Sequence, residues 1–288
     1  MDKKKKKIIS SIIGIIVVLL AGYFGIDLTQ DSKVPKDSEL MISYMDVGQG
    51  DAAYIKVNGN DILIDAGPRS NSKELLEQLK AKNIDDFELV IATHPHEDHI
   101  GGMVDVFKEY EVKAFYSPKI THTTKTYENL VKAVKDEGLK TKELKGGMVI
   151  DLGEGAKFEV FTPQKSEYEE LNDYSPIMKL SFGDTSYLFT GDAEKLAEEE
   201  ALAKYKTSLD SDVIKFGHHG SSSSSSNAFI EAVSPKYGII SCAKDNKYGH
   251  PHRETLDIIK KYNIKTFRTD TDGEIILTSD GKSINFNK

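Results

Sequence analysis

Four potential metal ligands stand within six consecutive positions of the chain, namely His94, His96, Asp98 and His99. Neutral imidazole and carboxylate are ligands that zinc accepts readily, and iron and manganese tolerate them too. His94 and His96 are two positions apart, so their rings point the same way in an extended loop, whereas Asp98 and His99 begin the next turn. The spacing predicts one ion held by the first pair and a second ion beside it. A solvated loop that is merely rich in histidine is the alternative.

The remaining candidate ligands also follow predicted strands. The apolar run 89–92 is typical of a buried strand, and it ends at the histidine cluster, where open α/β sheets usually place their ligands. Three further strands end near candidate ligands: strand 187–190 precedes Asp192, strand 213–216 precedes His218 and His219, and strand 238–241 precedes His250. We expect these side chains to converge at one edge of the fold.

Asp192 is the candidate for a shared ligand. A single carboxylate has two oxygens and can bridge two cations about 3.5 to 4 Å apart, which is the geometry of two-metal hydrolysis. A helix is predicted directly after it, so Asp192 could instead serve as the N-cap of that helix.

The carboxy-terminal histidines divide into ligands and substrate-facing groups. Neighbouring side chains on an extended segment point to opposite sides, so only one of His218 and His219 should ligate well, and we expect it to be His219. His218 is then free to form hydrogen bonds or to donate a proton to a leaving group. His250 is either the last ligand of the second ion or a substrate-facing acid. His252 reads as an exposed residue at a helix start.

Three further carboxylates and one side-chain amide stand in tight, glycine-containing turns at strand ends. Asp46, Gln49, Asp51 and Asp65 are predicted to scaffold these loops by bonding backbone N–H groups. Asp51 and Asp65 have a second interpretation, in which they orient the ligand histidines from behind.

Strands and helices alternate along the chain in an order typical of α/β packing. Further strands are predicted at 41–47, 52–57, 61–64, 113–116, 158–161 and 177–182, helices at 72–82, 103–110, 127–136, 194–204, 228–233 and 254–262, and a closing hairpin at 274–285. A β-rich segment followed by an α/β segment thus occurs twice.

The ligand loop resembles the H-x-H-x-D-H signature of the metallo-β-lactamase superfamily. Five flanking motifs narrow the resemblance to the hydrolase domain of the ComEC/Rec2 DNA-uptake (competence) proteins, over about residues 39–288: Asp46-Val47-Gly48-Gln49-Gly50-Asp51, Leu63-Ile64-Asp65-Ala66-Gly67, Thr190-Gly191-Asp192, Gly217-His218-His219-Gly220-Ser221 and Tyr248-Gly249-His250-Pro251. The resemblance implies a four-layer αββα sandwich, with Asp192 bridging two cations.

One departure from the superfamily pattern concerns the first ion. Many members supply a further histidine between the signature loop and the bridging aspartate, but here that interval contains only His122, in a threonine-rich loop. The corresponding region, Asn172-Asp173-Tyr174-Ser175, resembles the competence-type domain. This argues against a β-lactamase or glyoxalase-like activity.

The amino terminus has the pattern of a membrane anchor. Residues 8–26 carry no charge and follow five lysines, and at about 1.5 Å per residue they span nearly the ~30 Å of a hydrocarbon core. We predict a basic cytoplasmic tail at 1–7, a transmembrane helix at 8–26, a linker at 27–38, and a domain at 39–288 outside the cell membrane. A cleaved export signal that leaves a secreted protein is the alternative.

Charge limits the ways in which the domain can bind its substrate. The formal net charge is -8, and since residues 1–26 contain five lysines against one aspartate, the remainder carries -12. An acidic domain lacks the broad electrostatic affinity for nucleic acid that phosphate neutralisation provides, although a local basic strip is compatible with it. Cys242 is the one cysteine, so no internal disulfide forms.

These observations favour a hydrolase that activates water with two divalent ions, most readily Zn²⁺, with Mn²⁺ or Fe²⁺ as alternatives. We expect Asp98, His218 and His250 to take part in catalysis, Asp98 also as a ligand. The resemblance implies a phosphodiesterase or nuclease acting on DNA. The alternatives are an esterase that removes phosphorylcholine from cell-envelope teichoic acid, and a non-catalytic binding module stabilised by metal.

Overall fold

The computed structural model describes residues 39–287. The predicted basic tail, membrane anchor and linker, residues 1–38, lie outside this range. Among residues 39–287, no helix combines the length and the apolar character needed to cross a membrane.

The first sheet has eight strands in the order β17-β16-β1-β2-β3-β5-β7-β8. Its antiparallel part is β1 (Leu40–Tyr44), β2 (Ala53–Val57) and β3 (Asn60–Ile64), and the parallel strands β5 (Leu89–Ile91), β7 (Phe115–Pro118) and β8 (Thr141–Leu144) continue from β3. The closing hairpin, β16 (Ile275–Ser279) and β17 (Ile284–Asn287), completes this sheet by pairing antiparallel with β1. The end of the chain is thereby built into its first sheet.

The second sheet has seven strands in the order β15-β14-β13-β12-β11-β10-β9. It repeats the scheme of the first: β9 (Val149–Asp151), β10 (Lys157–Val160), β11 (Met178–Phe182) and β12 (Thr185–Phe189) are antiparallel, and β13 (Val213–Lys215), β14 (Tyr237–Ile240) and β15 (Lys265–Arg268) are parallel. A small parallel pair, β4 (Asp86–Phe87) and β6 (Glu111–Val112), stands apart. The predicted repeat of a β-rich segment and an α/β segment is confirmed.

Alternation along the strands explains why the sheets are covered on both faces. On β3, Ile62 and Ile64 belong to the core between the two sheets, whereas Leu63 belongs to the core beneath the helices of the first sheet. Successive side chains of a strand point to opposite faces, so a continuous apolar run has two faces to bury. Val213 and Ile214 on β13 divide in the same way between the central core and the helices of the second sheet.

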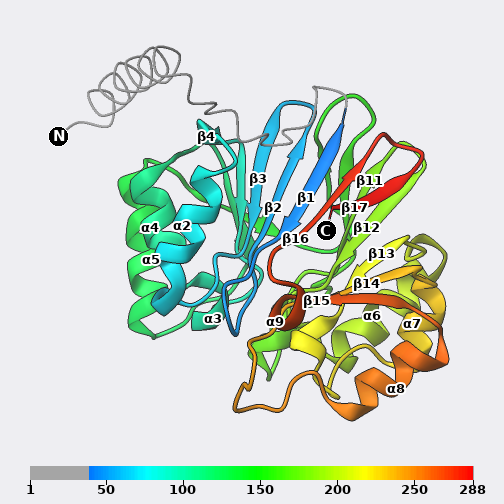
Figure 1. Ribbon diagram of the computed structural model, residues 1–288. Helices are drawn as coiled ribbons and strands as arrows, with labels where there is room; N and C mark the ends of the chain where they lie inside the picture. Colours follow the sequence, from blue (N-terminus) through cyan, green and yellow to red (C-terminus); the bar gives the residue numbers. More distant parts are fainter. Residues whose placement is uncertain (1–38, 288) are drawn as a thin grey trace. The chain divides into compact units, whose positions relative to one another are not determined.

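Helices cover the outer face of each sheet (Figure 1). The first sheet carries α2 (Ser72–Lys80), α3 (Glu97–Ile100), α4 (Met103–Glu109) and α5 (Lys125–Asp136), and the second carries α6 (Lys195–Tyr205), α7 (Asn227–Val233) and α8 (Arg253–Lys261), with the short α9 (Thr269–Asp272) following β15. The order of layers is helices, sheet, sheet, helices, as expected for an αββα sandwich.

The structure corrects the sequence predictions mainly at sheet edges. No strands were predicted for β8 and β9, where most side chains are exposed, because an edge strand need not carry an apolar pattern. β1 ends at Tyr44 instead of continuing to Val47, and the residues that follow turn toward the histidine cluster. The strand predicted at 113–116 lies at Phe115–Pro118.

Candidate metal centre

The candidate ligands meet at the carboxyl ends of the inner strands of both sheets. The loop after β5 carries His94 and His96, the loop after β12 carries Asp192, and the loop after β13 carries His219. Helix α3 begins directly after His96. Since parallel strands from the two facing sheets end at the same side of the sandwich, residues more than a hundred positions apart are brought into contact.

Glycine is required where a turn of the first sheet approaches the ligand loop. The Asp51 N–H donates to the Asp98 carbonyl at 3.1 Å. At the preceding Gly50, φ is +152° and a Cβ atom would lie 2.3 Å from the same carbonyl oxygen. No residue other than glycine fits this approach without moving the backbone.

Asp98, His99 and His219 surround Asp192 and form what we name the second metal position. The Asp192 Oδ2 atom lies 3.2 Å from His99 Nε2 and 3.5 Å from His219 Nε2, and His219 Nε2 lies 3.4 Å from Asp98 Oδ2. Ligands bonded to one ion at about 2.0 to 2.2 Å stand about this far apart. The expectation that His219 is the better placed of the two neighbouring histidines agrees with these distances.

The outer ring nitrogens of this position already have partners. His99 Nδ1 lies 2.8 Å from Asp65 Oδ2, and His219 Nδ1 lies 2.9 Å from the Ser241 carbonyl. Nδ1 is therefore the protonated atom that donates, and the Nε2 lone pair is directed inward. His99 Nε2, His219 Nε2 and Asp192 Oδ1 are buried and make no hydrogen bond. Buried, unpartnered ligand atoms facing one another fit a divalent ion.

We name His94, His96 and Asp192 the first metal position, after the sequence prediction. His94 and Asp192 are grouped with His99, whereas His96 belongs to none of the clustered groups of the described residues. His94 Nε2 lies 2.9 Å from His96 Nδ1 and 3.8 Å from Asp192 Oδ2. On its outer side, His94 Nδ1 contacts the Thr93 hydroxyl at 3.1 Å. No further histidine completes this position: His122 contacts the Thr124 hydroxyl at 3.0 Å and belongs to none of the clustered groups found among residues 39–287.

His218 and His219 both turn toward Asp192. Their φ angles are 47° and 55°, so the backbone is left-handed at two successive residues. His218 Nε2 lies 3.8 Å from Asp192 Oδ2, and its Nδ1 contacts Glu194 Oε1 at 3.1 Å. The prediction that the two rings point apart is wrong, because it assumed an extended backbone.

His250 stands at the wall of the site. Its ring centroid lies 5.5 Å from that of His218 and 6.1 Å from that of His219, and it joins none of the clustered groups in the described chain. Its Nδ1 atom faces the Gln49 amide at 3.5 Å. Burial and the neighbouring imidazoles of His219 and His218 lower the pKa of His250 to about 4.

Asp192 does not cap the helix that follows it. The residue before α6 is Glu194, and the backbone N–H groups of Glu194 and Ala197 donate to Asp173 Oδ1, each at 3.3 Å. Asp173 thus takes the capping role considered for Asp192. The neighbouring Ser175 hydroxyl accepts a bond from the Asp192 N–H at 3.1 Å, which positions the carboxylate.

Asp51 and Asp65 lie behind the ligands, as the orienting interpretation requires. Asp65 accepts from the Thr93 N–H at 2.8 Å and pairs with His99. Asp51 forms a 2.5 Å ion pair with Lys215. Burial would raise the pKa of Asp51, but the charges of Lys215 and His219 lower it. Asp46 and Gln49 act in loop scaffolding instead: Asp46 accepts from the Gly48 N–H and Gln49 from the Ala243 N–H.

Sequence reasoning missed Lys215. Its side chain is buried, and its ammonium also donates to the carbonyls of Gly191 and Phe216 at 3.0 and 3.2 Å. The available signal was a charged residue within the otherwise apolar strand 213–216. A buried cation needs partners, so such a lysine indicates a carboxylate nearby.

The carboxylates of the site keep two histidines protonated when no ion competes. Burial alone would lower the pKa of His219, but Asp192 and Asp51 raise it to about 9, and His99 is raised by Asp192 and Asp65 in the same way. Burial would raise the pKa of Asp98, yet His219 and His99 hold it at about 2. Binding of a cation releases these protons.

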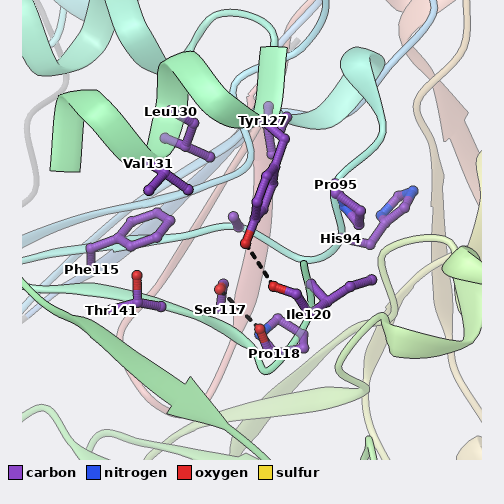
Figure 2. A pocket seen from close by; sticks show the side chains of 12 residues that line it. His94, Pro95, Phe115, Ser117, Pro118, Ile120, Tyr127, Leu130, Val131 and Thr141 are labelled. Carbon is purple, nitrogen blue, oxygen red and sulfur yellow. Dashed lines mark hydrogen bonds between the residues drawn. The ribbon is translucent and has the colours of Figure 1, made fainter. Parts of the chain in front are cut away.

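Two hollows adjoin the ligands. One, a hollow open to solvent with about 620 Å³ of empty space, is lined by Asp98, Asp192 and His250. The other, of about 360 Å³, lies beyond His94 and is walled by apolar side chains (Figure 2). There the Tyr127 hydroxyl already donates to the Ile120 carbonyl at 2.6 Å. Polar groups available for a reaction are therefore concentrated in the first hollow.

Comparison with known proteins agrees with this geometry. The family model described as the metallo-beta-lactamase superfamily matches residues 45–244. ComE operon protein 3 of Bacillus subtilis is 32% identical over 83% of this chain and 33% of its own length, and competence protein ComA of Neisseria gonorrhoeae is 27% identical over 90% of this chain and 34% of its length. Exodeoxyribonuclease YycJ of Bacillus anthracis is 29% identical over 24% of this chain and 26% of its length. The chain spans about a third of the two competence-type relatives.

Proposed function

Because the chain belongs to the metallo-beta-lactamase superfamily, we propose that it is a metal-dependent hydrolase that cleaves phosphodiester bonds, with DNA as its substrate. The observation that carries this proposal is the convergence of the buried, unpartnered Nε2 atoms of His99 and His219 on the buried Asp192 carboxylate. A non-catalytic domain with a structural metal would have no use for the adjoining polar hollow.

Two divalent ions are proposed, Zn²⁺ in the first place and Mn²⁺ or Fe²⁺ as alternatives, held by His94, His96, Asp98, His99, Asp192 and His219. Ions bound there would lower the pKa of water to about 7 and offset negative charge on the attacked centre. His250 faces the hollow rather than the clustered ligands, which favours the substrate-facing role over that of a further ligand.

The protein's own residues supply proton transfer and orientation. Asp98 is ionised at neutral pH and stands at the hollow, so it can orient the attacking water and accept its proton. His218 also lines the hollow and is placed to donate a proton to the leaving oxygen. His250 lines it too, but its lowered pKa keeps the ring neutral, so it can form a hydrogen bond to the substrate. Glu194 holds the His218 ring through Nδ1, which leaves Nε2 on the side of Asp192 and the hollow.

A phosphodiester is preferred for two reasons. Two adjacent cations suit an anionic phosphate, and the similarity covers competence proteins and, over a short stretch, an exodeoxyribonuclease. The membrane and DNA are the proposed partners: residues 8–26 would anchor the domain outside the cell membrane, or direct its secretion if they are cleaved.

Hydrolysis of bis(p-nitrophenyl) phosphate by the metal-loaded protein tests the enzyme. We expect turnover by the wild type and its loss in His96→Ala. A wild type that binds metal but is inactive would support the binding module instead.

Two substrates then distinguish the nuclease from the alternative esterase that removes phosphorylcholine from teichoic acid. The protein is incubated with single-stranded DNA and with p-nitrophenylphosphorylcholine under the same conditions. Cleavage of DNA supports the nuclease. Cleavage of p-nitrophenylphosphorylcholine alone would instead indicate an esterase that acts on cell-envelope teichoic acid.

A further inference from the structure

Tyr248 exposes an aromatic ring at the mouth of the site. It is 52% exposed, and it is the one aromatic among the exposed large hydrophobic side chains of residues 39–287. The ring lines the same 620 Å³ hollow as Asp98 and Asp192. Burying such a ring against a ligand would be favourable, because its apolar surface is in water in the free protein.

The loop that carries Tyr248 is held firmly. The Asn246 side chain donates to the carbonyls of Ala243 and His250 at 2.9 and 2.6 Å and accepts from the backbone N–H groups of Tyr248 and His250 at 3.2 and 3.0 Å. His252 Nε2 lies 3.0 Å from the Tyr248 carbonyl. The exposure of the ring is therefore a property of an ordered loop, and a ligand meets a ring already in place.

The surroundings of the ring suit a base with a phosphate beside it. The ring stacks on His250, with centroids 5.6 Å apart and planes 20° from parallel, and the exposed Lys247 ammonium lies 5.0 Å from the ring centroid. An ammonium on an exposed ring is held only weakly, so a planar base can displace it. The displaced Lys247 would then be within reach of the backbone phosphate.

A second depression, of about 920 Å³ and open to solvent, adjoins the hollow at His250. It is lined by Lys244 and Asp245 and by Arg268, which is paired with Asp270. The charged side chains of this depression therefore balance, and Lys247 over the Tyr248 ring is the cation beside the hollow that can meet a phosphate. A single cation of this kind suits a polymer that is bound at the site and not along the whole surface.

We propose that Tyr248 stacks a nucleobase next to the scissile phosphodiester and makes the site selective for single-stranded polynucleotides. This inference rests on the proposed phosphodiesterase function and names its substrate class. A base presents its face to a protein ring only when it is not stacked within a duplex, so an aromatic platform selects single strands.

The test compares an oligodeoxynucleotide with one that lacks bases around the cleaved position, each assayed with the wild type, Tyr248→Ala and Tyr248→Phe. In the wild type we expect KM for the abasic strand to be about tenfold higher, as stacking on one ring typically provides. Tyr248→Ala should remove this difference by weakening only the base-containing strand, and Tyr248→Phe should keep it. Equal KM values for both strands in the wild type, or a preference that survives in Tyr248→Ala, would overturn the proposal.

Binding measurements test the stacking proposal independently of the proposed nuclease activity. Fluorescence anisotropy of a labelled single strand is measured in the His96→Ala background, with and without Tyr248→Ala. If the protein cleaves no DNA but binds it through Tyr248, the nuclease proposal fails and the stacking stands. If Tyr248→Ala instead weakens the binding of p-nitrophenylphosphorylcholine and leaves the binding of the single strand unchanged, the ring is a choline site and the stacking proposal is wrong.

Discussion

The ligand rings of the second metal position have stronger hydrogen-bond partners on their outer sides than those of the first. His99 and His219 each bond through Nδ1 to a carboxylate or carbonyl oxygen, whereas His94 contacts only the Thr93 hydroxyl on its outer side and His96 points its Nδ1 at His94. Partners of this kind fix the tautomer and the direction of a ligand. Preorganisation, more than the number of histidines, distinguishes the two positions.

The first position also lacks the histidine that many superfamily members supply before the shared aspartate. Asp173 and Ser175 occupy the corresponding region, where they cap α6 and hold the Asp192 backbone. We therefore expect the two ions to differ in affinity, with the second position binding more tightly.

The largest effect is expected for Asp192→Ala, because this carboxylate contacts both positions. The variant should retain no ion after dialysis, and hydrolysis should fall by at least about a thousandfold. Metal content by emission spectroscopy and turnover of bis(p-nitrophenyl) phosphate measure this. Asp192→Asn, which keeps the size of the side chain, should retain more metal, and a full complement of ions in Asp192→Ala would exclude a bridging role.

Comparing His96→Ala with His99→Ala tests the difference in affinity directly. His96 belongs to the first position, so its loss should leave about one ion per chain, whereas loss of His99 also removes the partner of Asp65 and should lower the retained metal further. The readout is ions per chain at a fixed chelator concentration. Equal loss in the two variants would mean that the positions are equally strong.

Asp65→Asn should weaken the second position while leaving its ligands in place. The neutral amide holds His99 Nδ1 less strongly, and loss of such an outer partner typically costs about 10- to 100-fold in metal affinity. Competition with a chromophoric chelator measures the affinity. Asp46→Asn is the matched control, because Asp46 accepts only a turn hydrogen bond from Gly48, and it should change nothing.

The stability of the metal-free protein should depend on pH through His219. Its pKa is raised from 6.5 to about 9, so the stabilisation is fully present below pH 6.5 and is lost as the pH rises through 9. Urea denaturation of chelator-treated protein should show this loss, and metal-loaded protein should show much less of it, since the ion replaces the proton. The same decline in both forms would rule out His219 as a ligand.

The smallest effect on metal content is expected for His122→Ala. This variant tests whether His122 is a ligand of the first metal position. His122 contacts Thr124 and packs at the edge of Tyr127. We expect unchanged metal content and a change of less than about 0.5 kcal/mol in the free energy of unfolding. Loss of one ion would show that the position is complete after all.

The sequence predicted the parts of this protein that have a strong local pattern. The strand at 89–92 and the ligand loop after it were predicted because a buried run and closely spaced ligands are both visible in a short segment. The pairing of β16 with β1 was not predicted, because it joins segments that are far apart in the sequence. Edge strands β8 and β9 carry mostly exposed side chains and gave no signal.

Within the site, residue types were predictable and directions were not. Two adjacent histidines indicate metal, but only the left-handed backbone at His218 and His219 turns both rings to one carboxylate. The role of Asp173 as a helix cap depends on a contact between separate segments. Such features depend on tertiary structure, to which a local pattern contributes little.

The direction of β1 determines where the described part of the chain begins relative to the candidate metal centre. β1 runs from Leu40 toward the loop that packs on Asp98, so Leu40 lies at the end of the strand away from the candidate centre. The two ends of this five-residue strand, Leu40 and Tyr44, are about 13 Å apart. The rim of the sandwich that holds the candidate centre is therefore separate from the end of β1 at which Leu40 lies.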